Sequence, residues 1–264
     1  MLSLAIHGAG GRMGQRLIAL ASADLELTLA AAIESAQHPR LGQDAGLVAG
    51  VGELGIPLAS GLEQDVDVVI DFSTPSAVAG ILAICRQRKL PLVVATTGLE
   101  ESSKQSLKAA AREIPLLWSP SMSLAVNLAM QLSATAGAAL KGHPSGVDVE
   151  IIERHHRFKE DSPSGTALKF GQIIAGVMGQ TAERHGREGR PGERPQNEIA
   201  YHAVRAGDNP GEHTIVFGLL GETLEIAVRA TNRDCYAHGA LAAAKFLAAQ
   251  PPGMYGMEDV LRLR

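Results

Sequence analysis

The chain has 264 residues, of which 45% are hydrophobic, so it can bury the core of one large domain or of two modest domains. Its formal net charge of −4 argues against a nucleic-acid-binding protein. The two cysteines, Cys85 and Cys235, form no C-x-x-C pair, and no apolar run reaches transmembrane length. We therefore expect a reduced, cytoplasmic protein that has neither a metal site nor a membrane span.

The N-terminal segment predicts a nucleotide site. A short strand over residues 2–6 precedes the turn Gly8-Ala9-Gly10-Gly11-Arg12-Met13-Gly14, and an apolar helical stretch follows the turn. Met13 breaks the strict G-x-G-x-x-G spelling, but Gly8, Gly11 and Gly14 keep the spacing of a tight turn that a pyrophosphate can approach. Glu34 ends the next predicted strand, 20 residues after Gly14, where an acid meets the hydroxyls of the adenosine ribose.

The rest of the first half alternates strands with helices. Strands are predicted over residues 66–72, 90–96 and 115–118, and helices over 77–88 and 100–112. This alternation predicts an α/β fold of the Rossmann type, with a doubly wound parallel sheet. The strands end in turns, which are Ser73-Thr74-Pro75, Ala95-Thr96-Thr97-Gly98 and Ser119-Pro120-Ser121-Met122. Such turns face the ligand crevice of an open α/β sheet, although the same residues also form ordinary turns.

The second half has a different character. Helices are predicted over residues 124–140, 165–178 and 234–249, and a strand over 147–152. The arginine-rich segment 181–196 is read as a long loop, and three strands, 199–204, 213–217 and 223–230, are read as antiparallel hairpins. We therefore expect a dinucleotide-binding domain, residues 1–126 and 236–264, interrupted by a mixed α+β domain for substrate binding and oligomerisation, residues 127–235.

The most informative segment runs from Glu153 to Ala167. It places His155, His156 and Lys159 within five residues, directly before a Pro-Ser-Gly-Thr turn that can open a helix. Side chains that carry protons therefore lie beside backbone N–H groups that favour a carboxylate or a phosphate. A solvated basic loop would have the same composition, but the segment follows a predicted buried strand, whose end can line a crevice.

These motifs resemble the 4-hydroxy-tetrahydrodipicolinate reductase family, also called dihydrodipicolinate reductase. The resemblance rests on the Gly-rich turn, on Ala95-Thr96-Thr97-Gly98, on the His-His-x-x-Lys…Pro-Ser-Gly-Thr segment, and on the later pair Val204–Asp208 and Gly211–Thr214. It implies a Rossmann domain, a mixed-sheet domain that forms a homotetramer, and NAD(P)H-dependent reduction of a cyclic dicarboxylate imine in the diaminopimelate route to lysine.

The resemblance also implies roles for single residues. His155 corresponds to the acid/base residue of the family and Lys159 to its proton donor. His156, Gly165 and Thr166 correspond to residues that bind the substrate. The residues that correspond to the dinucleotide site are Gly8, Ala9, Gly10, Gly11, Arg12, Met13, Glu34, Ala95, Thr96, Thr97, Ser119, Pro120, Ser121 and Met122.

The sequence leaves open which coenzyme is preferred and to which functional class the protein belongs. Ser35 follows Glu34 where many members of the family carry an Arg that pairs with the 2′-phosphate of NADPH. We therefore expect NADH to be used at least as well as NADPH. An amino-acid dehydrogenase of the aspartate or homoserine type, or a nucleotide-sensing regulator, could share this architecture. The His-His segment argues against the first alternative, and a regulator would have no need of His155 and Lys159 beside an anion-binding turn.

Overall fold

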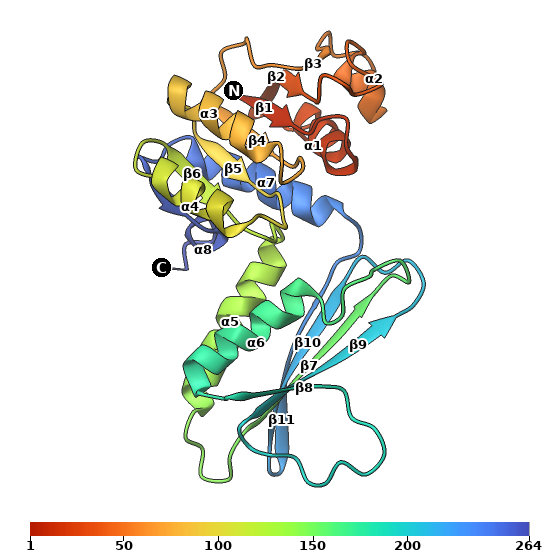
Figure 1. The fold of residues 1–264 in the computed structure, drawn as a ribbon, viewed down its shortest axis with the longest axis vertical. Coiled ribbons are helices and arrows are strands. Elements are labelled where there is room, and N and C mark those ends of the chain that lie inside the picture. The colour runs from red at the N-terminus through yellow and green to blue at the C-terminus, as the bar shows by residue number, and fades with distance from the viewer. Residues whose placement is uncertain (264) are drawn as a thin grey trace. The chain divides into compact units, whose positions relative to one another are not determined.

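The computed structural model describes residues 1–263, which divide into two compact units. Unit 1 consists of Met1–Leu124 together with the chain from Asp234 onward, and unit 2 consists of Ala125–Arg233 (Figure 1). The chain thus leaves unit 1 after Leu124 and returns before Asp234, where the sequence predicted crossings after residue 126 and before residue 236.

Unit 1 is built on one parallel sheet with the strand order β12-β6-β5-β4-β1-β2-β3. Its strands are β1 (Leu2–His7), β2 (Leu27–Ile33), β3 (Leu58–Ala59), β4 (Val68–Asp71), β5 (Leu92–Val94), β6 (Pro115–Trp118) and β12 (Gly253–Tyr255). Its helices are α1 (Arg12–Ser22), α2 (Ala45–Ala49), α3 (Val78–Arg88), α4 (Glu101–Ala110), α7 (Asp234–Leu247) and α8 (Met257–Val260). β2 and β4 pair with opposite edges of β1, so the strand order reverses at β1.

Both faces of this sheet are buried, as the doubly wound prediction requires. Leu4 and Ile6 of β1 pack into one apolar cluster with residues of α1 and α7, whereas Ala5 packs into the other with residues of α3 and α4. Successive side chains of a strand point to opposite faces, so the short apolar strands supply both cores at once. The Rossmann-type fold class is confirmed.

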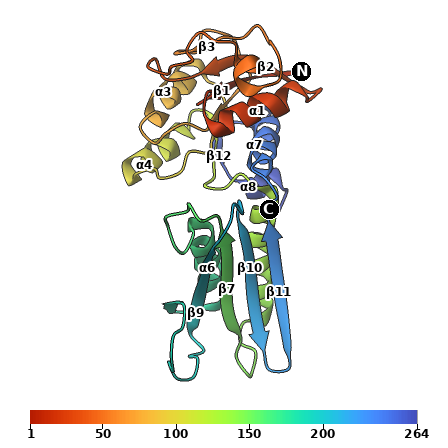
Figure 2. The same ribbon diagram turned by 90° about the vertical axis from the view of Figure 1, so that its right-hand side faces the viewer.

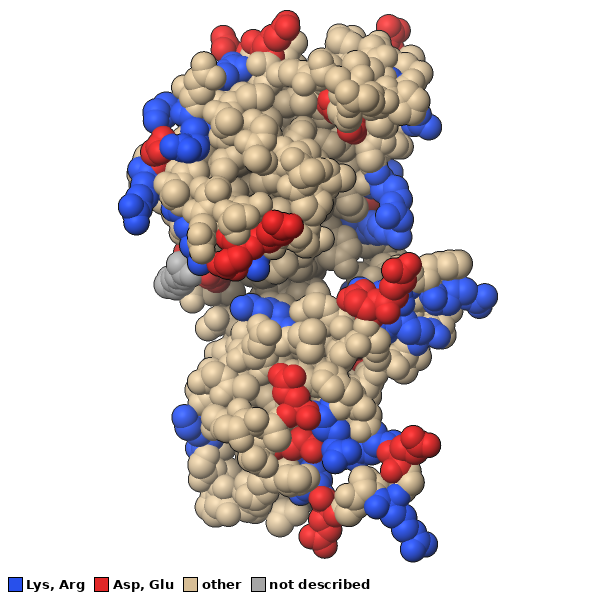
Figure 3. Space-filling model, in the orientation of Figure 1, with Lys and Arg blue, Asp and Glu red and all other residues tan. Residues whose placement is uncertain are grey.

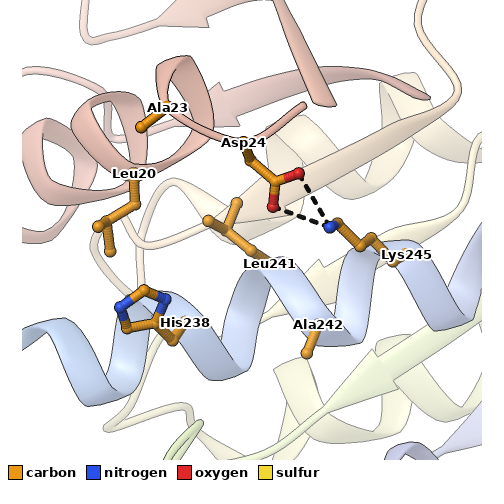
Figure 4. Close-up of a pocket in the computed structure, with 7 residues that line it drawn as sticks. All are labelled: Leu20, Ala23, Asp24, His238, Leu241, Ala242 and Lys245. Atoms are coloured by element: carbon orange, nitrogen blue, oxygen red, sulfur yellow. Dashed lines mark hydrogen bonds and ion pairs between the residues drawn. The ribbon is translucent and has the colours of Figure 1, made fainter. Parts of the chain in front are cut away.

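A surface pocket in unit 1 lies away from the predicted site residues. Leu20 and Asp24 from the α1 side and His238, Leu241 and Lys245 of α7 are among its lining residues (Figure 4). The Lys245 ammonium lies 2.8 Å from the Asp24 carboxylate and also pairs with Glu26. The pocket therefore lies between α7 and the turn after α1. Its two charged residues, Asp24 and Lys245, are paired with each other.

Unit 2 is a five-stranded sheet with two helices on one face (Figure 2). Its elements are α5 (Leu124–Leu140), β7 (Asp148–His155), α6 (Gly165–Met178), β8 (Ala182–His185), β9 (Glu198–Arg205), β10 (Glu212–Leu219) and β11 (Glu222–Arg229), and the strand order is β11-β10-β7-β9-β8. Val149 and Ile151 of β7 pack with Phe170 and Ile174 of α6 in the core between the sheet and the helices. The other face of the sheet carries no helix in Figure 2.

Two local predictions for unit 2 are wrong. Only β10 and β11 form the expected hairpin, because β9 runs parallel to β7 and to β8. The predicted loop over 181–196 also contains a strand, β8. Two of its arginines are engaged by carboxylates of the sheet: Arg187 and Arg194 each donate to Glu150, and Arg187 also donates to Glu198. Burial alone would raise the pKa of Glu150, but the hydrogen bonds from Arg187, Arg194 and His202 lower it to about 2.

Charged side chains of both signs share the surface. In Figure 3 the Lys and Arg side chains are interspersed with Asp and Glu side chains on the visible face of each unit. Within residues 1–263, no helix is both long enough and apolar enough to span a membrane.

The buried His213 predicts a pH dependence of stability. His213 is 4% exposed, and burial, followed by the neighbouring His155, lowers its pKa to about 4. In the unfolded chain this imidazole takes up a proton near pH 6.5, whereas in the folded chain it stays neutral until the pH is about 4. The unfolded state is therefore favoured increasingly as pH falls below 6.5. Between pH 7.5 and pH 5 the free energy of unfolding should fall by roughly 2 kcal/mol on account of this side chain.

Urea unfolding of the wild type and of His213→Gln at the two pH values tests this expectation. The variant should lose less stability on acidification than the wild type, whereas His143→Gln, which changes an exposed histidine, should behave like the wild type. An equal loss in His213→Gln and in the wild type would show that His213 titrates normally in the folded protein.

Candidate active site

The Gly-rich turn of unit 1 is shaped by contacts that leave no room for side chains. Gly8 has a φ of +82°, and a Cβ atom on it would lie 2.5 Å from the carbonyl oxygen of Phe72. A Cβ atom on Gly14 would overlap the carbonyl oxygen of Gly8. Glycine is therefore required at both positions, which hold the start of α1 close against the ends of β1 and β4.

The predicted acid reaches this turn. One carboxylate oxygen of Glu34 accepts a hydrogen bond from the Gly10 backbone N–H at 2.9 Å, and the other accepts one from the Ser35 N–H at 2.8 Å. The N-cap residue of α1 is Gly11, which has no side chain to cap the first N–H groups of the helix. The turn, the uncapped helix start and Glu34 together fit the phosphate and ribose of a dinucleotide.

The buried carboxylate of Asp71 holds the loops after β4 and β5 in place by hydrogen bonds. Asp71 ends β4 with an exposure of 0% and accepts hydrogen bonds from the Thr96 and Ser73 hydroxyls, each at 2.6 Å. The His7 ring, at the end of β1, lies 2.6 Å from the same carboxylate. Asp71 thus ties the ends of three adjacent strands, and it fixes the Thr96 loop. The sequence drew attention to Thr96 and Ser73, but not to Asp71 or His7.

The last predicted coenzyme loop follows β6. The Ser119 backbone N–H donates to the Val94 carbonyl at 3.2 Å, and its hydroxyl donates to the Ser121 carbonyl at 2.7 Å. Met122 is buried in the core of unit 1, while Pro120 and Thr97 are exposed. β5 and β6 are paired neighbours, so the loops that contain Thr97 and Pro120 leave the same edge of the sheet.

In unit 2 the histidine segment is organised around Glu153. This carboxylate is 1% exposed and receives two hydrogen bonds from the Arg205 guanidinium, at 2.7 and 2.8 Å. It also lies 2.5 Å from Nδ1 of His155 and accepts from the Ser164 backbone N–H at 3.2 Å. Burial would raise the pKa of Glu153, but the Arg205 and His155 hydrogen bonds hold it below its usual value. The carboxylate therefore stays charged and orients the His155 ring.

The second nitrogen of His155 faces a glycine. Because Nδ1 points at Glu153, Nε2 is the atom available for chemistry, and a Cβ atom on Gly211 would lie 2.9 Å from it. Burial lowers the pKa of His155, while the Glu153 carboxylate opposes that shift. The ring is consequently neutral near pH 7, with its proton held on Nδ1 by the carboxylate.

His156 and Lys159 lie on the turn after β7. The His156 backbone N–H donates to the Asn209 carbonyl, and Nδ1 of its ring is buried without a hydrogen-bond partner among residues 1–263. A buried ring nitrogen of this kind costs free energy unless a ligand or a water binds it. The Lys159 ammonium lies 2.6 Å from the Asp161 carboxylate, an ion pair whose acid is mostly exposed.

The predicted anion-binding turn opens α6. Ser164 is the N-cap, and its hydroxyl accepts from the Ala167 backbone N–H at 3.1 Å and contacts Nε2 of His213 at 3.1 Å. Gly165 and Thr166 are the first two residues of the helix, where N–H groups have no partner within the helix. The structure therefore brings Gly165 and Thr166 to the same end of unit 2 as His155, through the shared contacts of Ser164 and Glu153.

Sequence reasoning gave no role to Glu153, Arg205 or His213, although all three lie in segments that carry the resemblance to the family. Glu153 stands two positions before His155 in a strand, and residues two apart share a face, so alternation was a signal for that pair. Arg205 and His213 come from β9 and β10, so the resemblance was the signal that could have pointed to them. In the part of the chain that the structure describes, no group of three or more His, Cys, Asp or Glu side chains is arranged to hold a metal.

Comparison with known proteins identifies the family. Family models described as the N-terminus and the C-terminus of dihydrodipicolinate reductase match residues 2–122 and 125–261. A 4-hydroxy-tetrahydrodipicolinate reductase of Rhodopirellula baltica is 56% identical over 268 residues, which cover 98% of this chain and 96% of the relative. Another, of Alkalilimnicola ehrlichii, is 46% identical over 267 residues and covers 98% of both chains.

Solved structures agree. A dipicolinate-bound dihydrodipicolinate reductase of Paenisporosarcina sp. TG-14 superposes with a TM-score of 0.78 at 25% identity and covers 97% of each chain. The NAD complex of GenD2 from gentamicin A biosynthesis shares the fold, with a TM-score of 0.60 at 16% identity over 98% of this chain and 90% of that one. The chain therefore belongs to the dihydrodipicolinate reductase family, and its reaction is the reduction of 4-hydroxy-tetrahydrodipicolinate with a nicotinamide coenzyme in the diaminopimelate route to lysine.

Proposed function

We propose that the chain performs this reduction with a coenzyme held by unit 1 and a cyclic dicarboxylate held by unit 2. The observation that carries this assignment is the Glu153 cluster, which presents one oriented imidazole, an ammonium and a helix start together. A dicarboxylate requires cationic and N–H partners, and proton transfer requires a group with a defined donor or acceptor atom. The cluster supplies both.

The coenzyme site is proposed on the Gly-rich turn and the loops beside it. Gly8 to Met13 would bind the pyrophosphate, Glu34 the ribose hydroxyls, and Ala95 to Thr97 with Ser119 to Met122 the nicotinamide half. A coenzyme bound there supplies the hydride. Because Glu34 accepts hydrogen bonds and Ser35 carries no charge, we infer that NADH is used at least as well as NADPH.

The substrate site is proposed on the turn that opens α6. Gly165 and Thr166 would bind one carboxylate through their N–H groups and the Thr166 hydroxyl. The buried Nδ1 of His156 supports a second polar contact to the substrate, since it lacks a partner within residues 1–263. The Lys159 ammonium would leave its ion pair with Asp161 and pair instead with the bound dicarboxylate, which carries more negative charge.

Lys159 and His155 are the residues proposed to transfer protons. Hydride addition to a conjugated imine leaves an enamine-like anion that needs a proton, and the Lys159 ammonium is the group proposed to donate it. Nε2 of His155 would act as the acid/base atom, because Glu153 keeps the other ring nitrogen occupied. A neutral imidazole whose Nδ1–H points at a carboxylate is a better proton acceptor at Nε2 than an isolated ring.

Replacing the proposed proton-transfer residues should abolish most of the turnover. His155→Ala and Lys159→Ala should each lower kcat by on the order of 10²-fold or more, because each removes a group that transfers protons. The measurement is the steady-state oxidation of NADH with substrate made by the preceding synthase. Coenzyme affinity, measured by fluorescence titration, should barely change, because both residues belong to unit 2.

Matched controls are His143→Ala and Lys141→Ala, which change exposed residues of the same unit and should leave kcat unchanged. Near wild-type turnover in either test variant would remove that residue from the mechanism.

The quaternary structure is proposed to be a cytoplasmic homotetramer assembled through unit 2. Ile152 of β7 and Val204 of β9 are 43% and 44% exposed on the sheet face that α5 and α6 do not cover. The edge strand β11 is also largely exposed along its length. Exposed apolar sheet surface and open edges are seldom left uncovered, so both features support assembly.

Light scattering after gel filtration tests the assembly. A tetramer of the 27.6 kDa chain is expected at micromolar concentration, and Ile152→Lys should shift the population toward smaller species. Leu25→Lys, at a 91% exposed apolar position of unit 1, is the control and should remain tetrameric. A wild-type protein that elutes and scatters as a monomer would defeat the proposal.

A further inference from the structure

Asp161 lies in the segment between β7 and α6, and its main chain is attached to the Glu153 cluster. The Arg205 guanidinium, which pairs with Glu153, also donates to the Asp161 carbonyl oxygen at 2.7 Å. Nearby, the Lys159 backbone N–H donates to the His156 carbonyl at 3.1 Å. The main chain of this segment is therefore held independently of the Asp161 carboxylate, whose side chain is 58% exposed.

The Asp161 carboxylate contacts two of the groups proposed to bind the substrate. The Lys159 ammonium lies 2.6 Å from one of its oxygens. Burial would raise the pKa of Asp161, but the hydrogen bond and the charge of Lys159 hold it below its usual value, and hydrogen bonds from the backbone of Asp161 itself and of Gly165 add to that effect. Gly165 is the first residue of α6. The free protein thus already holds a carboxylate between an ammonium and the start of this helix.

The other charges beside Asp161 leave its pair with Lys159 intact. The Arg205 guanidinium is engaged by both oxygens of the Glu153 carboxylate. Glu160, the next acid in the chain, is exposed. The Lys159 side chain is 22% exposed, so its ammonium is more covered than the carboxylate it contacts. Lys159 is therefore the cation for which Asp161 and an incoming carboxylate would compete.

A cyclic dicarboxylate needs the partners that Asp161 now occupies. In the substrate site proposed above, on which this inference rests, one substrate carboxylate binds to Gly165 and Thr166 beside Lys159. Two carboxylates at one ammonium repel each other as strongly as each would attract a cation at the same distance. The Asp161 carboxylate must therefore leave as the substrate carboxylate enters.

We propose that Asp161 is a positioning residue, which holds Lys159 and the start of α6 in the free enzyme and is displaced by a carboxylate of the substrate. The displaced side chain turns toward solvent while its main chain stays bound to Arg205. The contact stabilises the free enzyme and therefore weakens substrate binding. An exposed ion pair of this kind changes affinity by about twofold to fivefold.

The test is the affinity for dipicolinate, a planar cyclic dicarboxylate, measured by calorimetric titration of the intact protein with saturating NADH. Asp161→Asn removes the charge and keeps the size of the side chain. Its dissociation constant should be about twofold to fivefold lower than that of the wild type, because Lys159 has no acid to give up. A variant that only loosened this segment would bind dipicolinate more weakly. An unchanged or higher dissociation constant in Asp161→Asn would overturn the proposal.

Glu160→Gln is the matched control. It removes the same charge one position away, from an exposed side chain, and should leave the dissociation constant at the wild-type value. An equal fall in Glu160→Gln and in Asp161→Asn would show that the effect comes from the net charge of the segment. That result would also overturn the role of Asp161.

The amide resonance of Gly165 reports the displacement without any turnover. In protein labelled on glycine nitrogen and free of dipicolinate, this resonance should differ between the wild type and Asp161→Asn, because the charged acceptor is lost. With saturating dipicolinate the two resonances should approach each other, because the ligand carboxylate is then the acceptor in both proteins. Identical Gly165 resonances in the two ligand-free proteins would contradict the contact between Asp161 and α6, and with it the proposal.

Lys159→Ala separates this proposal from the substrate site on which it rests. If the site is placed correctly, Lys159→Ala should weaken dipicolinate binding, and dipicolinate should shift the Gly165 resonance of the wild type. If both hold and Asp161→Asn binds no more tightly, the role of Asp161 alone is rejected. If Lys159→Ala binds dipicolinate normally and the Gly165 resonance does not respond, the substrate site is rejected together with the role of Asp161.

Discussion

The buried Glu153 carboxylate is the constraint on which the candidate active site of unit 2 depends. A carboxylate that is 1% exposed keeps its charge only if hydrogen bonds and opposite charges replace the water it has lost. Arg205 of β9, His155 of β7 and the backbone before α6 provide those partners. The same contacts that satisfy Glu153 therefore hold the imidazole, the Arg205 guanidinium of β9 and the start of α6, the helix proposed to bind the substrate carboxylate.

Unit 1 uses the same device at a different place. Asp71, with an exposure of 0%, draws the Thr96 hydroxyl, the Ser73 hydroxyl and the His7 ring to the ends of three adjacent strands. Parallel strands end together at one edge of a sheet, and one carboxylate there can order several loops at once. In each unit a buried acid holds neighbouring side chains and backbone groups in place by hydrogen bonds. Binding and proton transfer require groups that are positioned in advance in this way.

The parts of the fold that local sequence encodes were predictable. The alternation of short apolar strands and helices predicted the doubly wound sheet, and the spacing of Gly8, Gly11 and Gly14 predicted the turn before α1. The direction of β9 was not predictable in this way, because three neighbouring strands separated by short polar segments read as hairpins. Parallel pairing of β9 with β7 depends on contacts that are distant in sequence.

The candidate site, too, contains residues that local sequence reveals and residues that only the fold brings together. His155, Lys159 and the helix start are contiguous in sequence, so the segment revealed them. Arg205 and His213 join the cluster only through sheet pairing, which brings β9 and β10 to the two edges of β7. The arginine-rich segment 181–196 was predicted to be a loop, yet the Arg187 guanidinium within it is engaged with Glu150 and Glu198 of the sheet.

The central claim is that the charge on Glu153 sets the protonation of His155. The direct measurement is an NMR titration of the His155 ring in the wild type and in Glu153→Gln, with amide spectra to show that the fold is kept. The carboxylate favours the imidazolium, so replacing it with a neutral amide should lower the pKa of His155 further below its ordinary value. A His155 pKa that is unchanged or higher in Glu153→Gln would contradict the account, because the buried acid would then have no favourable electrostatic interaction with the His155 imidazolium.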